Sequence, residues 1–130
     1  MNKRILIVED DVLILEWLKR KLEEQGYEIL TVKNEEGFWK YIFDEKLSLV
    51  ILDICLKNLL TSEVYKTLFK SENGKRIPVI VTAGFGQTLD FDIREIRDEH
   101  YVFLPQPLNF EKLSYEVKNF FKEKQTEKAA

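Results

Sequence analysis

The chain has 130 residues, of which 45% are hydrophobic and 33% are charged, a balance that excludes a disordered or low-complexity segment. The 20 Lys and Arg residues against 23 Asp and Glu residues give a net charge of -3, without the basic excess typical of nucleic-acid-binding proteins. No apolar run approaches the roughly 20 residues of a membrane-spanning helix, so we expect neither nucleic acid nor membrane as a partner.

The single cysteine, Cys55, excludes an internal disulfide and a cysteine cage for a metal ion. The first residues become acidic too soon after a short apolar run to form a signal peptide. We therefore expect a cytoplasmic protein that forms one domain over residues 1–130. Within it, residues from about 122 to 130 are expected to be a charged helix end or a tail.

The first part of the chain alternates apolar runs with amphipathic segments. Residues 5–8 are all aliphatic, which is typical of a strand buried on both faces. Residues 12–25 place leucines along one helical stripe, and we expect Gly26 to end this helix in a left-handed conformation. Residues 27–32 are the second predicted strand, and Asn34 is a candidate N-cap for the helix that follows.

The rest of the chain continues the same alternation. Pro78 is compatible with a strand only near its beginning, because proline has no N–H to donate to a neighbouring strand. The remaining predicted elements are strands at residues 47–52, 77–82 and 101–104, and helices at residues 62–69, about 89–99 and from Phe110 toward 122–128.

This strict alternation of strands and helices predicts the fold class. Strands that are apolar on both faces need helices on each side, so the sequence predicts an α/β protein with a doubly wound, five-stranded parallel sheet. In such folds, ligands bind beyond the carboxyl ends of the strands. The functional residues are therefore sought where each strand ends.

Acidic residues follow two of the predicted strands. Glu9, Asp10 and Asp11 come after the first strand, and Asp53 comes after the third. If these strands are neighbours about 4.8 Å apart, the carboxylates converge and repel one another unless a cation lies between them. Oxygen ligands of this kind favour Mg²⁺. Taken singly, Asp10 or Asp11 could instead cap a helix, and Asp53 could be an ordinary loop residue.

Three runs of this sequence resemble the response-regulator receiver domain of two-component signalling: residues 5–11 (ILIVEDD), 49–53 (LVILD) and 79–83 (VIVTA). The resemblance covers essentially the whole chain and implies a flavodoxin-like receiver fold. It further implies that Asp53 accepts a phosphoryl group. The Mg²⁺ ligands that it implies are Glu9, Asp10, Asp53 and the backbone carbonyl of Cys55.

The resemblance also implies how phosphorylation would be sensed, and it shows departures. Thr82 would be the switch hydroxyl, and Phe103 the aromatic side chain that responds to it. Gln106 stands where the family usually has lysine, so a hydrogen-bond donor without charge replaces a cation near Asp53. Lys57 is a candidate substitute, with a solvated loop lysine as the alternative.

The resemblance therefore implies a stand-alone response regulator that is not a turnover enzyme. A histidine kinase or phosphotransferase would supply the phosphoryl group. A downstream protein would contact the surface formed by the fourth predicted helix, the fifth strand and the last helix, where Leu89, Phe91 and Tyr115 are candidates if exposed. The alternative is a receiver-like interaction module that works without phosphorylation. A flavodoxin-like hydrolase or flavin protein is remote, since neither a catalytic base pair nor a phosphate-cradling loop is evident.

Overall fold

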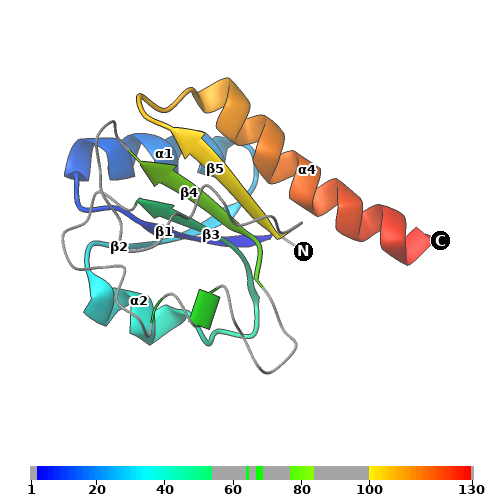
Figure 1. Cartoon of the computed structure of the whole chain (residues 1–130), viewed down its shortest axis with the longest axis horizontal. Helices are drawn as coiled ribbons and strands as arrows, with labels where there is room; N and C mark the ends of the chain where they lie inside the picture. Colours follow the sequence, from blue (N-terminus) through cyan, green and yellow to red (C-terminus); the bar gives the residue numbers. More distant parts are fainter. Residues whose placement is uncertain (1–2, 54–63, 65–66, 69–76, 84–99, 130) are drawn as a thin grey trace.

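The computed structural model describes residues 3–53, 64, 67–68, 77–83 and 100–129 of the chain (Figure 1). Of the helix predicted at 62–69, the described positions 64, 67 and 68 are helical, whereas the helix predicted at 89–99 lies outside the described residues. The described elements are β1 (Arg4–Val8), α1 (Val12–Glu24), β2 (Glu28–Val32), α2 (Glu35–Tyr41), β3 (Leu47–Asp53), β4 (Val79–Ala83), β5 (Tyr101–Pro105) and α4 (Phe110–Ala129).

The strands form one five-stranded sheet in the order β2-β1-β3-β4-β5, with every neighbouring pair parallel. The chain first adds β2 on one side of β1 and then adds β3 on the other. The order therefore reverses between β1 and β3, and the crevice at such a reversal is where doubly wound folds bind ligands. The predicted fold class is confirmed.

The sheet separates two hydrophobic cores, and Figure 1 shows the helices that cover them: α1 and α4 on one face and α2 on the other. Successive residues of a strand point to opposite faces, so neighbours such as Ile7 and Val8 belong to different cores. On the α2 face, Phe38 is fully buried, and on the other face Leu22 and Leu113 are fully buried. This arrangement explains why the strands are apolar without alternation.

The helix ends follow the predicted capping residues. Asn34 Oδ1 accepts the Gly37 N–H at 2.9 Å and caps α2. Gly26, just after α1, has a φ of 94°, a left-handed conformation in which a Cβ would be strained. The last predicted helix continues to Ala129, so residues 122–129 extend the helix and do not form a separate tail.

Two strand boundaries were predicted too early. Tyr27 lies outside β2, because its N–H donates to the Leu22 carbonyl in the turn that ends α1. Pro78 precedes β4, which begins at Val79, since proline cannot donate to the neighbouring strand. Its carbonyl still accepts the Val50 N–H at 3.0 Å, so the chain already runs beside β3 at this point.

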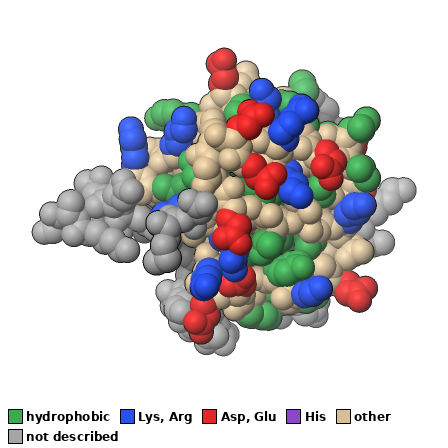
Figure 2. Space-filling view, turned by 180° about the vertical axis from the view of Figure 1, so that it is seen from behind, with side chains coloured by type: hydrophobic (Ala, Val, Ile, Leu, Met, Phe, Trp, Pro, Cys, Tyr) green, Lys and Arg blue, Asp and Glu red, His purple; other side chains and the backbone are tan. Residues whose placement is uncertain are grey.

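The surface carries charges of both signs. On the face behind the view of Figure 1, Figure 2 shows Lys and Arg side chains interspersed with Asp and Glu side chains over the described part of the chain. This mixture matches the nearly balanced composition, with a net charge of -3. Among the helices of the described residues, none combines the length and the apolar character that a bilayer crossing requires.

Candidate phosphoryl-acceptor and metal site

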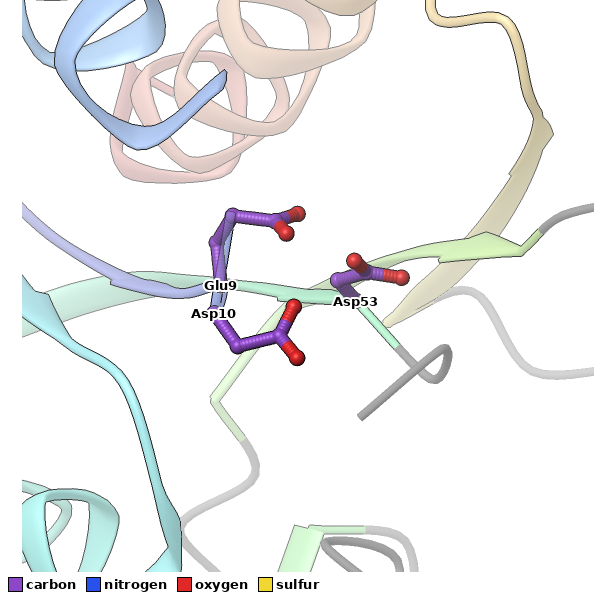
Figure 3. Close-up of side chains that lie close together, drawn as sticks. All are labelled: Glu9, Asp10 and Asp53. Atoms are coloured by element: carbon purple, nitrogen blue, oxygen red, sulfur yellow. The ribbon is translucent and has the colours of Figure 1, made fainter. Parts of the chain in front are cut away.

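Three carboxylates gather at the carboxyl ends of β1 and β3. Glu9, Asp10 and Asp53 each offer one oxygen atom, and these atoms all lie within 4.8 Å of one another. Glu9 and Asp53 are 3% and 4% exposed, whereas Asp10 faces solvent. Figure 3 shows the side chains converging from the end of β1 and the end of β3. The predicted convergence of acidic residues is therefore present in the structure.

Backbone hydrogen bonds hold Glu9 in place. Its N–H donates to the Val32 carbonyl at 3.0 Å, which continues the pairing of β1 with β2 beyond the last strand residue. Its Oε1 accepts the Asp11 N–H at 3.0 Å. The side chain is thus fixed from both the sheet and the start of α1.

Asp11 does not join the carboxylate cluster. Its Oδ1 accepts the backbone N–H groups of Leu13 at 2.9 Å and Ile14 at 3.3 Å, so it is the N-cap of α1. The sequence left the cap open between Asp10 and Asp11, and the structure assigns it to Asp11. Asp10 is therefore left at the rim of the cluster.

The cluster has a strong electrostatic cost in the absence of a cation. Burial, and then the hydrogen bond with Asp53, raise the pKa of the Glu9 carboxyl to about 8, while the Asp11 N–H acts in the opposite direction. The proton that Glu9 keeps relieves part of the repulsion, and a divalent cation would relieve more. Carboxylate oxygens, two buried and one at the rim, are a donor set that fits Mg²⁺.

Gln106 contacts the predicted acceptor directly. It follows β5, and its Nε2 donates to Asp53 Oδ1 at 3.2 Å. The Gln106 amide therefore contacts Asp53 through a neutral hydrogen bond, and its equivalence to the family's lysine stays a prediction. Lys57, the candidate substitute cation, and Cys55, the predicted carbonyl ligand, lie outside the described residues.

Thr82 and Phe103 have different surroundings. Thr82 is 3% exposed and is the register partner of Asp53 between β4 and β3, beside the site. Phe103 is half-buried and packs against the core on the α2 face. The structure thus brings Thr82 to the site. The predicted response of Phe103 to Thr82 stays a prediction.

A cavity of about 330 Å³ opens beside Asp53. Its polar lining comes from Glu9, Asp53, Thr82 and Gln106, and its wall is otherwise apolar, including Ile14, Trp17 and Leu108. The sequence did not predict this cavity. The available signal was that Ile14, Trp17 and Leu18 share one helical face just after the cap of α1.

The structure describes only part of the candidate surface for a downstream protein. Tyr115 on α4 is 65% exposed, so this one candidate is available to a partner. Leu89 and Phe91 lie outside the described residues.

Comparisons with known proteins are consistent with this geometry. The family model for the response regulator receiver domain matches residues 5–118. The alkaline phosphatase synthesis transcriptional regulatory protein PhoP of Bacillus subtilis is 40% identical over 68 residues, which are 52% of this chain and 28% of that protein. The chain spans between 28% and 56% of the length of four curated relatives that it matches.

Solved structures agree over most of the chain. A response regulator receiver domain protein from Methanospirillum hungatei is 28% identical with a TM-score of 0.77, over 98% of this chain and 99% of that one. The response regulator TrrA of Thermotoga maritima, solved with Mg²⁺ and BeF, is 30% identical with a TM-score of 0.69, over 91% of this chain and 98% of that one. TrrA has also been solved in complex with the histidine kinase ThkA.

Proposed function

Because the chain belongs to the response regulator receiver domain family of two-component signalling, we propose that it accepts a phosphoryl group on Asp53 with the help of Mg²⁺. The observation that carries the proposal is the position of Asp53: it is buried at the end of β3, in contact with Glu9 and Gln106. Asp10 completes the carboxylate cluster at the rim. The TrrA structure with Mg²⁺ and BeF supports the same use of this site here.

The chemistry would be a transfer from a phosphohistidine to a carboxylate. An Asp53 oxygen attacks phosphorus, an O–P bond forms, and the P–N bond of the donor breaks. When bound by Glu9, Asp10 and Asp53, Mg²⁺ supplies positive charge that neutralises the phosphoryl oxygens. Gln106 orients the carboxylate before attack, and the Thr82 hydroxyl is the nearby donor for the phosphoryl group once it is in place.

Intact-mass measurement tests this proposal. Incubation with acetyl phosphate and Mg²⁺ is expected to add one phosphoryl group to the wild-type chain and none to Asp53→Asn. Asp11→Asn is the matched control, because it makes the same change at an acid that caps α1 and lies outside the cluster. Addition to Asp53→Asn, or none to wild type and control alike, would overturn the assignment.

A second candidate is a receiver-like interaction module that works without phosphorylation. The observation that favours it is the Gln106 amide at 3.2 Å from Asp53, where the family usually has a cation. In this case Gln106→Lys is expected to restore phosphorylation by acetyl phosphate to a chain that otherwise takes up none. Gln106→Met, which removes the donor without adding charge, should stay unmodified.

We further propose a histidine kinase as the phosphoryl donor, as the ThkA complex of TrrA suggests by likeness. The downstream partner would be a protein that contacts β5 and α4, where Tyr115 is exposed. Receiver domains are signalling modules, so the chain acts as a phosphoryl acceptor and not as a turnover enzyme. A cytoplasmic location and a stand-alone single domain stay predictions.

A further inference from the structure

We propose that the cavity beside Asp53 binds a small primary ammonium compound with an apolar body, such as an arylalkylammonium ion. The cavity volume of about 330 Å³ lies within the range of sites for small molecules. It corresponds to the space of about ten water molecules, or of a ligand with on the order of a dozen non-hydrogen atoms. Binding itself does not depend on phosphorylation of the protein.

The wall of the cavity selects the apolar body. Ile14 and Trp17 come from α1, Ile51 from β3, and Leu108 from the segment between β5 and α4. The Trp17 ring packs edge-on against Phe110, with the ring centroids 5.7 Å apart, so the indole has a fixed position. An apolar ligand therefore gains from burial against a preformed wall.

The polar lining of the cavity selects the ammonium group. Glu9 and Asp53 both line the cavity and are buried, and Gln106 directs its Nε2 to Asp53. Among the described residues that line the cavity, none is basic. In the metal-free protein, a head group that donates hydrogen bonds and carries positive charge is thus matched, whereas a carboxylate or phosphate head would meet carboxylates with no cation to bridge them.

The same carboxylates would hold Mg²⁺ under the proposed function, so the ammonium compound and the metal should exclude each other. By linkage, each lowers the affinity of the other by the same factor. The compound would then inhibit phosphorylation of Asp53. Only this regulatory consequence rests on the proposed function.

The test uses 2-phenylethylammonium titrated into metal-free Trp39→Phe protein, so that Trp17 is the remaining tryptophan and can be excited selectively over the five tyrosines. Trp39 packs against Phe38 on the other core and does not line the cavity. We expect a saturable change in Trp17 fluorescence. The isosteric 2-phenylethanol lacks the charge and should bind at least about tenfold more weakly. Equal affinity of the amine and the alcohol would overturn the ammonium assignment.

A pair of matched variants locates the binding. Leu108→Phe fills the cavity and should abolish the saturable change. Leu30→Phe makes the same substitution at another half-buried leucine, which packs on the α2 face, and should leave binding intact. Ile14→Phe repeats the cavity filling from α1 if Leu108→Phe does not give a native circular dichroism spectrum. Loss of the saturable fluorescence change in both the cavity variants and the control variant would exclude this site.

Phosphorylation is measured separately on the same protein by intact mass. Binding of 2-phenylethylammonium without any uptake of phosphate would support the cavity and overturn the proposed function. Uptake of phosphate without saturable binding of the amine would support the proposed function and overturn the cavity as an ammonium site. If both occur, Mg²⁺ should weaken amine binding, and simultaneous independent binding would overturn the shared-carboxylate part of the inference.

Discussion

At the scale of single residues, Glu9, Asp10 and Asp11 are adjacent in the chain but meet different surroundings. Glu9 is buried against Asp53, Asp10 lies at the solvent-exposed rim, and Asp11 caps α1. The backbone turn between β1 and α1 separates them, since Glu9 still pairs with β2 and Asp11 already begins the helix. All three residues are acidic, so the residue types alone did not predict these three different surroundings.

The buried position of Glu9 makes stability depend on pH. In the metal-free folded chain the carboxyl keeps its proton up to a pKa of about 8, whereas in the unfolded chain it releases the proton near the ordinary value of 4.5. Between these values the folded state binds more protons, so stability falls as pH rises through this window. The expected loss over the whole window is on the order of 5 kcal/mol.

Urea unfolding in EDTA between pH 5 and pH 9 measures this dependence. Glu9→Gln is neutral at every pH and should remove most of the slope. Glu16→Gln is the control, because Glu16 is an exposed acid of α1 outside the cluster, and it should keep the wild-type slope. A slope that survives in Glu9→Gln would contradict the assignment to Glu9.

At the scale of elements, the start of α1 connects the helix to the site. The Asp11 N–H donates to Glu9 Oε1, while the Asp11 side chain accepts from Leu13 and Ile14. One residue therefore fixes both the first turn of the helix and the orientation of a cluster carboxylate. The capping motif could be predicted from the sequence, but this double role could not, because it depends on the path of the backbone.

Asp11→Ala removes the cap and is expected to cost about 1 kcal/mol of unfolding free energy, within a range of 0.5–2 kcal/mol. Asp11→Asn keeps a capping oxygen and should stay within a few tenths of a kcal/mol of wild type. Chemical denaturation of wild type, Asp11→Asn and Asp11→Ala checks this order of stability. Equal losses in the two variants would mean that the charge of Asp11, and not its hydrogen bonds, stabilises α1.

At the scale of the whole molecule, the site depends on strand order. Glu9 and Asp53 are 44 positions apart in the sequence and meet only because β3 lies beside β1. Occupation of their cluster by a metal ion should therefore stabilise the folded chain as a whole, since the unfolded chain does not bring the carboxylates together.

Thermal unfolding with and without Mg²⁺ checks this coupling. At a free concentration of 100 times the dissociation constant, the gain is about 2.7 kcal/mol. Wild type and Asp11→Asn should show the same increase in Tm, whereas Asp10→Asn should need more Mg²⁺ to reach it. Equal shifts in Asp10→Asn and Asp11→Asn would remove Asp10 from the metal site.

Much of this arrangement could be predicted from the sequence. Unbroken aliphatic runs such as residues 5–8 predicted a sheet covered on both faces, because such strands must be buried on both sides. The convergence of the acidic side chains could be predicted because the carboxyl ends of neighbouring parallel strands lie together. The contact of Gln106 with Asp53 was expected only through the family resemblance. The cavity was missed, because its wall combines α1, β3 and the segment after β5, and no sequence pattern reports a hollow between them.

The amino-terminal ends of the strands carry a different charge arrangement. Arg4 begins β1 and pairs with Glu28 at 2.7 Å and with Asp44 at 2.5 Å, so unlike charges attract each other there. The carboxyl ends of the strands, with Glu9 and Asp53, instead bring acidic groups together. Raising ionic strength screens exposed charges far more than buried ones. Arg4 and its two partners are partly exposed, whereas Glu9 and Asp53 are buried. Added monovalent salt should therefore weaken the Arg4 ion pairs and change the carboxylate cluster little.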